Sequence, residues 1–188
     1  SKEAYVEPTY NLTVNTTPAD ASFYIRVGAA LSLQDKSKPI PLTPGEYYTN
    51  TIAKTDDYKD DVRTINITQD MTLNITLLRR PWVEFKVTPS DAVVMFNDAG
   101  TWVQGTKFRC LEGLTYEYTV SKTGFDTQIG TVVVGTQDIV KNITLVSNVR
   151  IDKEKRFPGT FKLLDITKPE YITEKGSVVI AGADKLVN

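Results

Sequence analysis

An internal repeat constrains the fold of this chain more strongly than any other feature. The segments Gly45 to Leu77 and Gly113 to Leu145 carry the same order of motifs, 68 positions apart (113 − 45), and both end in Asn-Ile-Thr-Leu. Upstream, the Thr-Pro-x-Asp-Ala motifs that begin at Thr17 and Thr88 stand 71 positions apart (88 − 17). The two copies therefore differ by three residues in a loop, a difference that surface loops tolerate. A period of about 70 residues is too long for a solenoid unit and fits a small β-domain.

Both copies have the pattern of short, half-buried strands, and no helical stripe of useful length is present. Apolar and polar residues alternate with a period of two, as at Phe23, Ile25 and Val27 in the first copy and Tyr116, Tyr118 and Val120 in the second. Gln34 to Pro44 holds three prolines and is predicted to be a loop with one short edge strand. Residues 131–134 and 143–146 are predicted to close one sheet. We therefore predict an all-β chain of two tandem small Ig-like β-sandwiches and a C-terminal β-appendage or arm.

The repeat also predicts the domain boundaries. Residues 1–9 form an N-terminal arm, 10–79 the first sandwich, 80–146 the second, and 147–188 an appendage that could serve as an anchoring segment. The connection around Leu78 to Pro81 lacks the Gly/Ser composition of a flexible linker. Each copy is near the smallest size that folds without a disulfide or a metal. Contacts between the copies, or with another chain, are therefore expected to matter for stability.

Composition and charge argue against several classes of function. The net charge is −1 and the basic residues are scattered, so nucleic acid is not an expected partner. No apolar run is long enough to span a bilayer, so membrane insertion is not expected. Histidine is absent, and the single cysteine, Cys110, is predicted to be a buried, inert thiol. No nucleophile elbow, phosphate loop or metal-ligand cluster occurs, so we expect no enzyme activity and no cofactor.

The densest acidic cluster is the only candidate for a metal site. Asp56, Asp57, Asp60 and Asp61 surround Tyr58 in the turn before the next predicted strand. Oxygen-rich loops can hold Ca²⁺, but the alternating Asp spacing of a calcium loop is missing. The alternative is a solvated hairpin whose charges discourage pairing at a sheet edge.

Two tryptophans are candidates for a binding surface. Trp102 lies beside a Gly-rich turn, which favours its exposure, and Trp82 follows directly after the connection between the copies. Together with tyrosines these side chains could bind sugar, as aromatic rings do in carbohydrate-binding sandwiches. Aromatic residues on one strand face are more often part of the core. Burial in the core and a sugar-binding surface are therefore both open for these side chains. A host-surface glycan is accordingly one candidate partner.

The order of motifs in each copy resembles PEGA-type repeats. In the second copy these are Thr-Pro-Ser-Asp-Ala from Thr88, an apolar strand, Gly-x-x-Tyr from Gly113, Lys-Thr-Gly-Phe from Lys122, and a closing Asn-Ile-Thr-Leu from Asn142. The likeness covers about residues 10 to 146, and the family's Asn-Gly turn is replaced here by Asn97-Asp-Ala-Gly. The resemblance implies small Ig-like modules of bacterial surface proteins and tailed-phage virions, which act as spacers or binding platforms.

These observations favour a non-catalytic structural or display protein on a large assembly. A virion surface component, of the capsid-decoration or fibre-base type, is the preferred expectation, because the chain starts without a signal-like segment and ends in a non-repeat tail. The expected partners are proteins of a capsid or envelope. Whether the chain also forms a homo-oligomer is left open by the sequence. One alternative is a module of a bacterial cell-surface adhesin or cell-wall protein, located on the cell surface. Another is a carbohydrate-binding accessory module.

Overall fold

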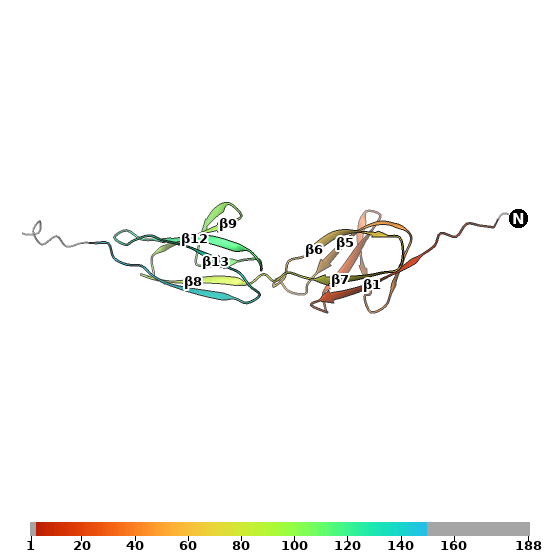
Figure 1. Cartoon of the computed structure of the whole chain (residues 1–188), viewed down its shortest axis with the longest axis horizontal. Helices are drawn as coiled ribbons and strands as arrows, with labels where there is room; N and C mark the ends of the chain where they lie inside the picture. The colour runs from red at the N-terminus through yellow and green to blue at the C-terminus, as the bar shows by residue number, and fades with distance from the viewer. Residues whose placement is uncertain (1–2, 150–188) are drawn as a thin grey trace, which may run out of the picture. The chain divides into compact units, whose positions relative to one another are not determined.

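The computed structural model describes residues 3–149, and within them the chain is all-β (Figure 1). This confirms the predicted fold class. Strands form because β-branched and aromatic residues alternate with polar ones, which suits a pleated sheet with one buried face. Most of the predicted appendage, from residue 150 onward, lies outside the described residues. No helix among the described residues has the length and hydrophobicity to cross a membrane.

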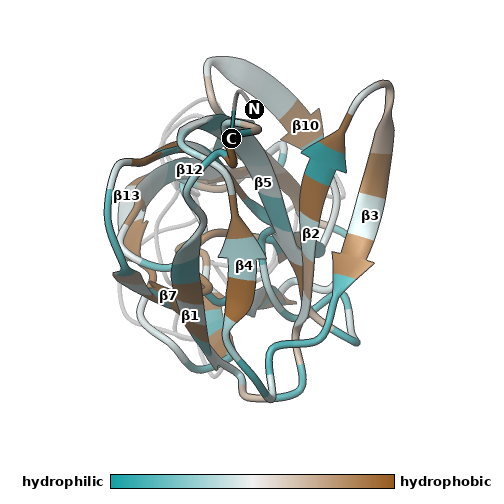
Figure 2. Ribbon diagram, turned by 90° about the vertical axis from the view of Figure 1, so that its right-hand side faces the viewer, coloured by the Kyte–Doolittle hydropathy of each residue, from teal (hydrophilic) through white to brown (hydrophobic). Residues whose placement is uncertain are grey.

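The first copy folds into two facing sheets. Its strands are β1 (Tyr10–Thr17), β2 (Ser22–Val27), β3 (Ala30–Gln34), β4 (Ile40–Leu42), β5 (Gly45–Ile52), β6 (Asp61–Ile67) and β7 (Met71–Thr76). One sheet has the order β4-β1-β7 and the other β3-β2-β5-β6, and Figure 2 shows β4 beside β1 and β3 beside β2. β1 and β7 pair in parallel, whereas the other neighbours are antiparallel.

The second copy repeats this topology strand for strand. Its strands are β8 (Trp82–Thr88), β9 (Val93–Asp98), β10 (Thr101–Gln104), β11 (Lys107–Arg109), β12 (Thr115–Ser121), β13 (Gln128–Val133) and β14 (Ile139–Thr144). The sheets have the orders β11-β8-β14 and β10-β9-β12-β13, and β8 and β14 pair in parallel. The peptide bonds before Pro18 and Pro89 are cis in both copies. The sequence repeat is therefore a repeat of one fold.

Each copy has its own hydrophobic core, and the two cores differ in composition. The first is mainly aliphatic, with Leu12, Phe23, Ile25, Ile67 and Ile75 among its most buried members. The second contains a cluster of aromatic rings at 4.4–6.0 Å between centroids, formed by Phe85, Phe96, Phe108, Tyr116 and Tyr118. The described clusters share no residue, so each sandwich buries its own apolar face.

The three-residue difference between the copies lies in one loop. In the first copy, Gln34 pairs with Phe23, and the chain returns to the other sheet at Ile40, so five residues (35–39) connect β3 to β4. In the second copy, the Gly105 N–H donates to Val94 and the return strand meets β8 at Phe108, with two residues between. The first copy thus carries a three-residue insertion, hereafter the 35–39 loop.

One strand was not predicted, and one predicted pairing is wrong. The strand β3 (Ala30–Gln34) was missed, because Ala-Leu-Ser-Leu-Gln has neither the β-branched residues nor the buried face of a typical strand. The segments predicted to close one sheet belong to different sheets: β13 lies beside β12, whereas β14 begins at Ile139 and pairs with β8. A sandwich alternates between its sheets along the chain, and periodicity alone does not show which sheet a strand joins.

The segment that connects the copies is hydrogen bonded along its length. Arg79 donates its N–H to the Glu112 carboxylate at 2.7 Å, and its carbonyl accepts from the Glu112 N–H at 3.0 Å. The Pro81 carbonyl accepts from Cys110 at 2.9 Å. On the other side, an isolated bridge pairs Arg79 with Tyr58. These bonds satisfy the backbone of a segment that has no Gly/Ser flexibility.

Candidate binding sites

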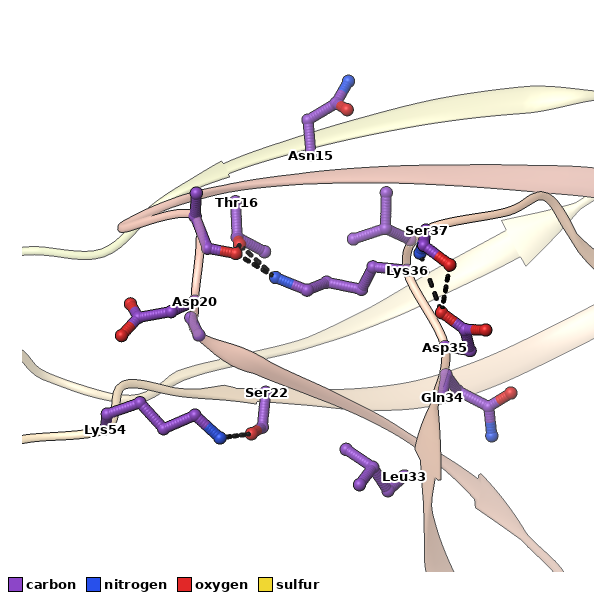
Figure 3. Close-up of a pocket in the computed structure, with 13 residues that line it drawn as sticks. Asn15, Thr16, Asp20, Ser22, Leu33, Gln34, Asp35, Lys36, Ser37 and Lys54 are labelled. Atoms are coloured by element: carbon purple, nitrogen blue, oxygen red, sulfur yellow. Dashed lines mark hydrogen bonds between the residues drawn. The ribbon is translucent and has the colours of Figure 1, made fainter.

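The 35–39 loop forms one wall of a pocket of about 510 Å³ in the first sandwich (Figure 3). The opposite walls are the end of β1 and the turn that leads from Pro18 into β2. Polar side chains predominate in this pocket, among them Thr16, Asp20, Ser22, Lys36 and Lys54. The pocket therefore exists where the two copies of the repeat differ in length.

Lys36 extends from the 35–39 loop across the pocket. Its Nζ donates to Thr16 Oγ1 at 2.5 Å and to the Ala19 carbonyl at 2.8 Å (Figure 3). Partial burial lowers the pKa of Lys36, and the nearby ammonium of Lys54 lowers it as well, whereas the Asp20 carboxylate opposes them. The ammonium thus joins the inserted loop to the turn before β2.

Lys54 and Asp20 differ from their counterparts in the second copy. There, the matching pair Lys122 and Asp91 forms an ion pair, which lowers the pKa of Asp91. In the first copy, Lys54 instead donates to Ser22 Oγ at 3.1 Å. Figure 3 shows the Asp20 carboxylate directed away from Lys36, and no ion pair of Asp20 is found within residues 3–149.

The donors of this pocket suit the binding of a small polar group. Lys36 and Lys54 each have an N–H that can reach a small anion or a hydroxyl group, because an ammonium has three donors. The other carboxylate of the pocket, Asp35, accepts from both the N–H and the Oγ of Ser37, and these bonds lower its pKa. Sequence reasoning missed the pocket, although the three-residue insertion was a signal for it.

The acidic cluster that was considered for calcium is not drawn together. Asp57 accepts from Arg109 Nη1 at 3.3 Å, and Asp61 binds Arg63 through both carboxylate oxygens at 2.6 and 2.8 Å. The other two members, Asp56 and Asp60, lie on the same exposed loop. No group of three or more His, Cys, Asp or Glu side chains within residues 3–149 is placed to share a metal ion. Arginine partners therefore hold two of the four carboxylates.

Trp82 is half-buried and covered by cations. Lys107 Nζ lies 4.9 Å from its ring centroid and the Arg109 guanidinium carbon lies 4.5 Å from it. Its backbone N–H donates to the Asp138 carboxylate at 2.9 Å. This cation–π arrangement is a stabilising contact of β8 with β11. A glycan site that includes Trp82 stays a prediction.

Trp102 is the accessible tryptophan. It lies on the edge strand β10, is 44% exposed and stands opposite Asn97 on β9. Asn97 donates to the Glu117 carboxylate at 3.2 Å, so a polar row runs beside the indole. By contrast, Tyr116 and Tyr118 are buried in the core. A glycan site at Trp102 stays a prediction.

Cys110 is buried, as the sequence indicated. Its side chain is 3% exposed, and burial, with a smaller contribution from Asp98, raises the pKa of the thiol to about 11. A thiol with so high a pKa is protonated at neutral pH, and the thiolate is the reactive form.

Comparisons with known proteins give one sequence relative and several structural neighbours. No family model matches the chain. A head fiber dimeric protein of Bacteroides phage crAss001 is 43% identical over 61 residues, which cover 32% of this chain and 46% of that protein. The match therefore spans less than half of the relative.

The comparison with solved structures finds neighbours of low similarity. The minor pilin of Streptococcus agalactiae has a TM-score of 0.36 at 8% identity, covering 77% of this chain and 99% of that one. A streptococcal ancillary pilin has a TM-score of 0.33 at 15% identity, covering 76% and 62%. Likeness at these TM-scores carries no argument about function.

Proposed function

We propose that this chain is a non-catalytic structural protein on the surface of a phage virion, a head fibre or head decoration. The observation that carries the proposal is the 43% identity over 61 residues to a head fiber protein of Bacteroides phage crAss001. Protein partners in a capsid assembly follow from the same reasoning.

The architecture is compatible with a display role. Tandem sandwiches with separate, well-packed cores present rigid surfaces, and their functions sit on edges and loops. Three of the described carboxylates are held by arginine, lysine or serine partners, namely Asp61, Asp91 and Asp35. The single thiol is buried and protonated. These features favour structure over catalysis.

The test is whether the native chain is part of a particle. Virions are purified by density-gradient sedimentation, and peptides of this chain and of the major capsid protein are quantified in each fraction. A constant ratio of the two across the virion peak is expected. A chain that stays at the top of the gradient, or that fractionates with the host cell envelope, contradicts the virion role. The second result would favour the bacterial surface alternative.

Attachment is assigned to residues 147–188 as part of this proposal. Residues 10–146 are accounted for by the two repeats, so the non-repeat segment is the candidate anchor. Particles that lack the protein are mixed with chain 1–188 or with chain 1–146, and bound protein is measured after sedimentation. The shorter chain is expected to keep its β-sheet circular dichroism and to lose binding. Equal binding by both chains would place the anchor within the sandwiches.

A glycan-binding role is a second candidate, favoured by the 44% exposure of Trp102. Exposed aromatic rings next to polar side chains suit stacking on a sugar face. A glycan array probed with the intact chain should give a signal that Trp102→Ala abolishes. Val103→Ala is the matched control, because Val103 lies on the same strand and is 42% exposed. An array without any signal removes this candidate.

A further inference from the structure

The edge strand β13 lacks the protection that natural sheets give to their edges. Within residues 3–149, β13 pairs only with β12, so its other side is unpaired. Ile129 is 75% exposed and Val133 is 70% exposed. Residues 127–137 contain no charged side chain and no proline. Exposed edges are usually blocked by charge, proline or a bulge, because free backbone groups recruit another strand.

The first copy shows that the fold does not require this apolar edge. Strand β6 holds the same place at the edge of its sheet as β13 does. It carries Asp61 and Arg63, whose side chains bind each other at 2.6 and 2.8 Å. The same edge of the same fold is therefore charged in one copy and uncharged in the other, and the difference lies in the sequence.

Three residues of β13 direct their backbone N–H and carbonyl groups to the unpaired edge of the sheet. Val134, just beyond the strand, uses both its N–H and its carbonyl toward the β12 side, bonding Leu114 and Gly113 at 2.9 and 2.8 Å. Backbone groups alternate along a strand, so the N–H and carbonyl of Ile129, Thr131 and Val133 point to the unpaired side. All three residues are β-branched, which favours strand pairing.

We propose that β13 pairs with β13 of a second copy of this chain, antiparallel and with a two-fold axis at Thr131. This register sets Thr131 against itself and Ile129 against Val133 of the second copy. Each facing pair joins outward-directed residues, so each exchanges two backbone hydrogen bonds. The side chains meet as β-branched cross-strand pairs, which stabilise sheets.

The charge distribution selects a second copy as the occupant. A two-fold axis brings each residue at or beside the axis close to its own copy, so a charge there would lie near a like charge. The run 127–137 contains none, and the nearest charged residues, Asp126 and Asp138, lie outside it at either end. Strand β6 carries Asp61 and Arg63 and is not free of charge in this way. Pairing of β13 with a second copy does not depend on the virion role.

The test uses the intact chain in analytical ultracentrifugation over a concentration series. The wild-type chain is expected to sediment as a dimer. Thr131→Lys places two ammonium groups at the axis and should weaken dimerisation by at least about tenfold, because like charges across an interface are strongly unfavourable. Thr64→Lys is the matched control. Thr64 is exposed at the corresponding position of β6, and its variant should dimerise like the wild type.

Hydrogen exchange of the wild-type chain then locates the interface. The amides of Ile129, Thr131 and Val133 should be protected in the dimer and should exchange freely in Thr131→Lys, with the other strands unchanged. A dimer in which these amides exchange freely would place the interface elsewhere and overturn the proposal. A wild-type monomer overturns it too. If the amides are protected in that monomer, another segment of the same chain covers the strand.

Discussion

Gly130 lies on β13 directly against the ring of Tyr118. A Cβ atom at this position would stand 2.5 Å from the Tyr118 hydroxyl and 2.6 Å from its Cζ. The ring cannot move away freely, because it is 5% exposed and packs edge-to-face on Phe85 at 5.0 Å. We expect Gly130→Ala to destabilise the protein by about 1–3 kcal/mol, the usual cost of overpacking a core. Urea denaturation at a fixed protein concentration measures this.

Gly135 provides the control for that substitution. No atom lies within 4 Å of a Cβ built there, and its φ is not in the left-handed region. Gly135→Ala should therefore leave stability within about 0.5 kcal/mol of the wild type, or raise it slightly through the unfolded state. If both alanine variants have the same stability, the ring of Tyr118 does not prevent a larger side chain at position 130.

The thiol of Cys110 should be inert while the protein is folded. Its pKa is raised to about 11 by burial, so at pH 8 almost all of it is protonated and unreactive. A disulfide reagent at pH 8 is expected to label it at a rate set by unfolding, and rapidly once urea is added. Fast labelling of the folded chain would contradict the burial. Because the folded pKa is raised, the neutral thiol is favoured, and stability falls as the pH rises through the unfolded thiol's pKa toward 11.

At the scale of elements, Lys36 anchors the 35–39 loop. Its ammonium donates to Thr16 Oγ1 and to the Ala19 carbonyl, and the site is partly buried. Lys36→Met keeps the length of the side chain and removes both hydrogen bonds. We expect a loss of about 1–2 kcal/mol, in the range of hydrogen bonds from a charged donor less the cost of burying it. Chemical denaturation and amide exchange in residues 35–38 report the change.

Lys38 in the same loop makes a matched comparison. It pairs with Asp35 at 3.6 Å, and the two side chains are 73% and 56% exposed. Exposed pairs of this kind contribute close to nothing, so Lys38→Met should change neither stability nor exchange. Equal effects of the two methionine variants would mean that the loop responds to its charge and not to the contacts of Lys36.

The sequence predicted the β-class and the repeat because alternation and self-similarity are local signals. It predicted the exposure pattern of Tyr116, Tyr118 and Val120 for the same reason, and all three are buried. It did not predict β3, whose Leu31 and Leu33 lie on an edge with a solvent-facing side. Strand formation there depends on the partner β2 and not on intrinsic propensity.

The pocket was harder to predict than the strands. It joins Thr16, Lys36 and Lys54, which are distant in sequence and meet only through the topology of the sandwich. Of the predicted site residues, Trp102 is exposed, whereas Trp82 is covered by two cations. Covering of this kind depends on pairing between β8 and β11, which no local pattern reveals.

At the scale of the whole molecule, the described hydrophobic cores of the two copies have no residue in common. The side-chain ion pair between Asp57 and Arg109 spans 3.3 Å, and the aspartate is 51% exposed. Such a pair contributes at most about 1 kcal/mol. The remaining bonds, including those of Arg79 to Glu112, are made by the short connecting segment. We therefore infer that a destabilising substitution in one core leaves the stability of the other core unchanged.

Phe96 tests this separation. It is 1% exposed and stacks on Phe108 at 4.4 Å, so Phe96→Ala should cost about 3–5 kcal/mol, a large part of the stability of so small a sandwich. Because the joining contacts are weaker than this cost, amide exchange should accelerate in residues 82–144 and stay unchanged in 10–76. Phe23→Ala, in the first core, should give the reverse pattern. If either variant accelerates exchange equally in both copies, the connecting segment couples the sandwiches into one cooperative unit.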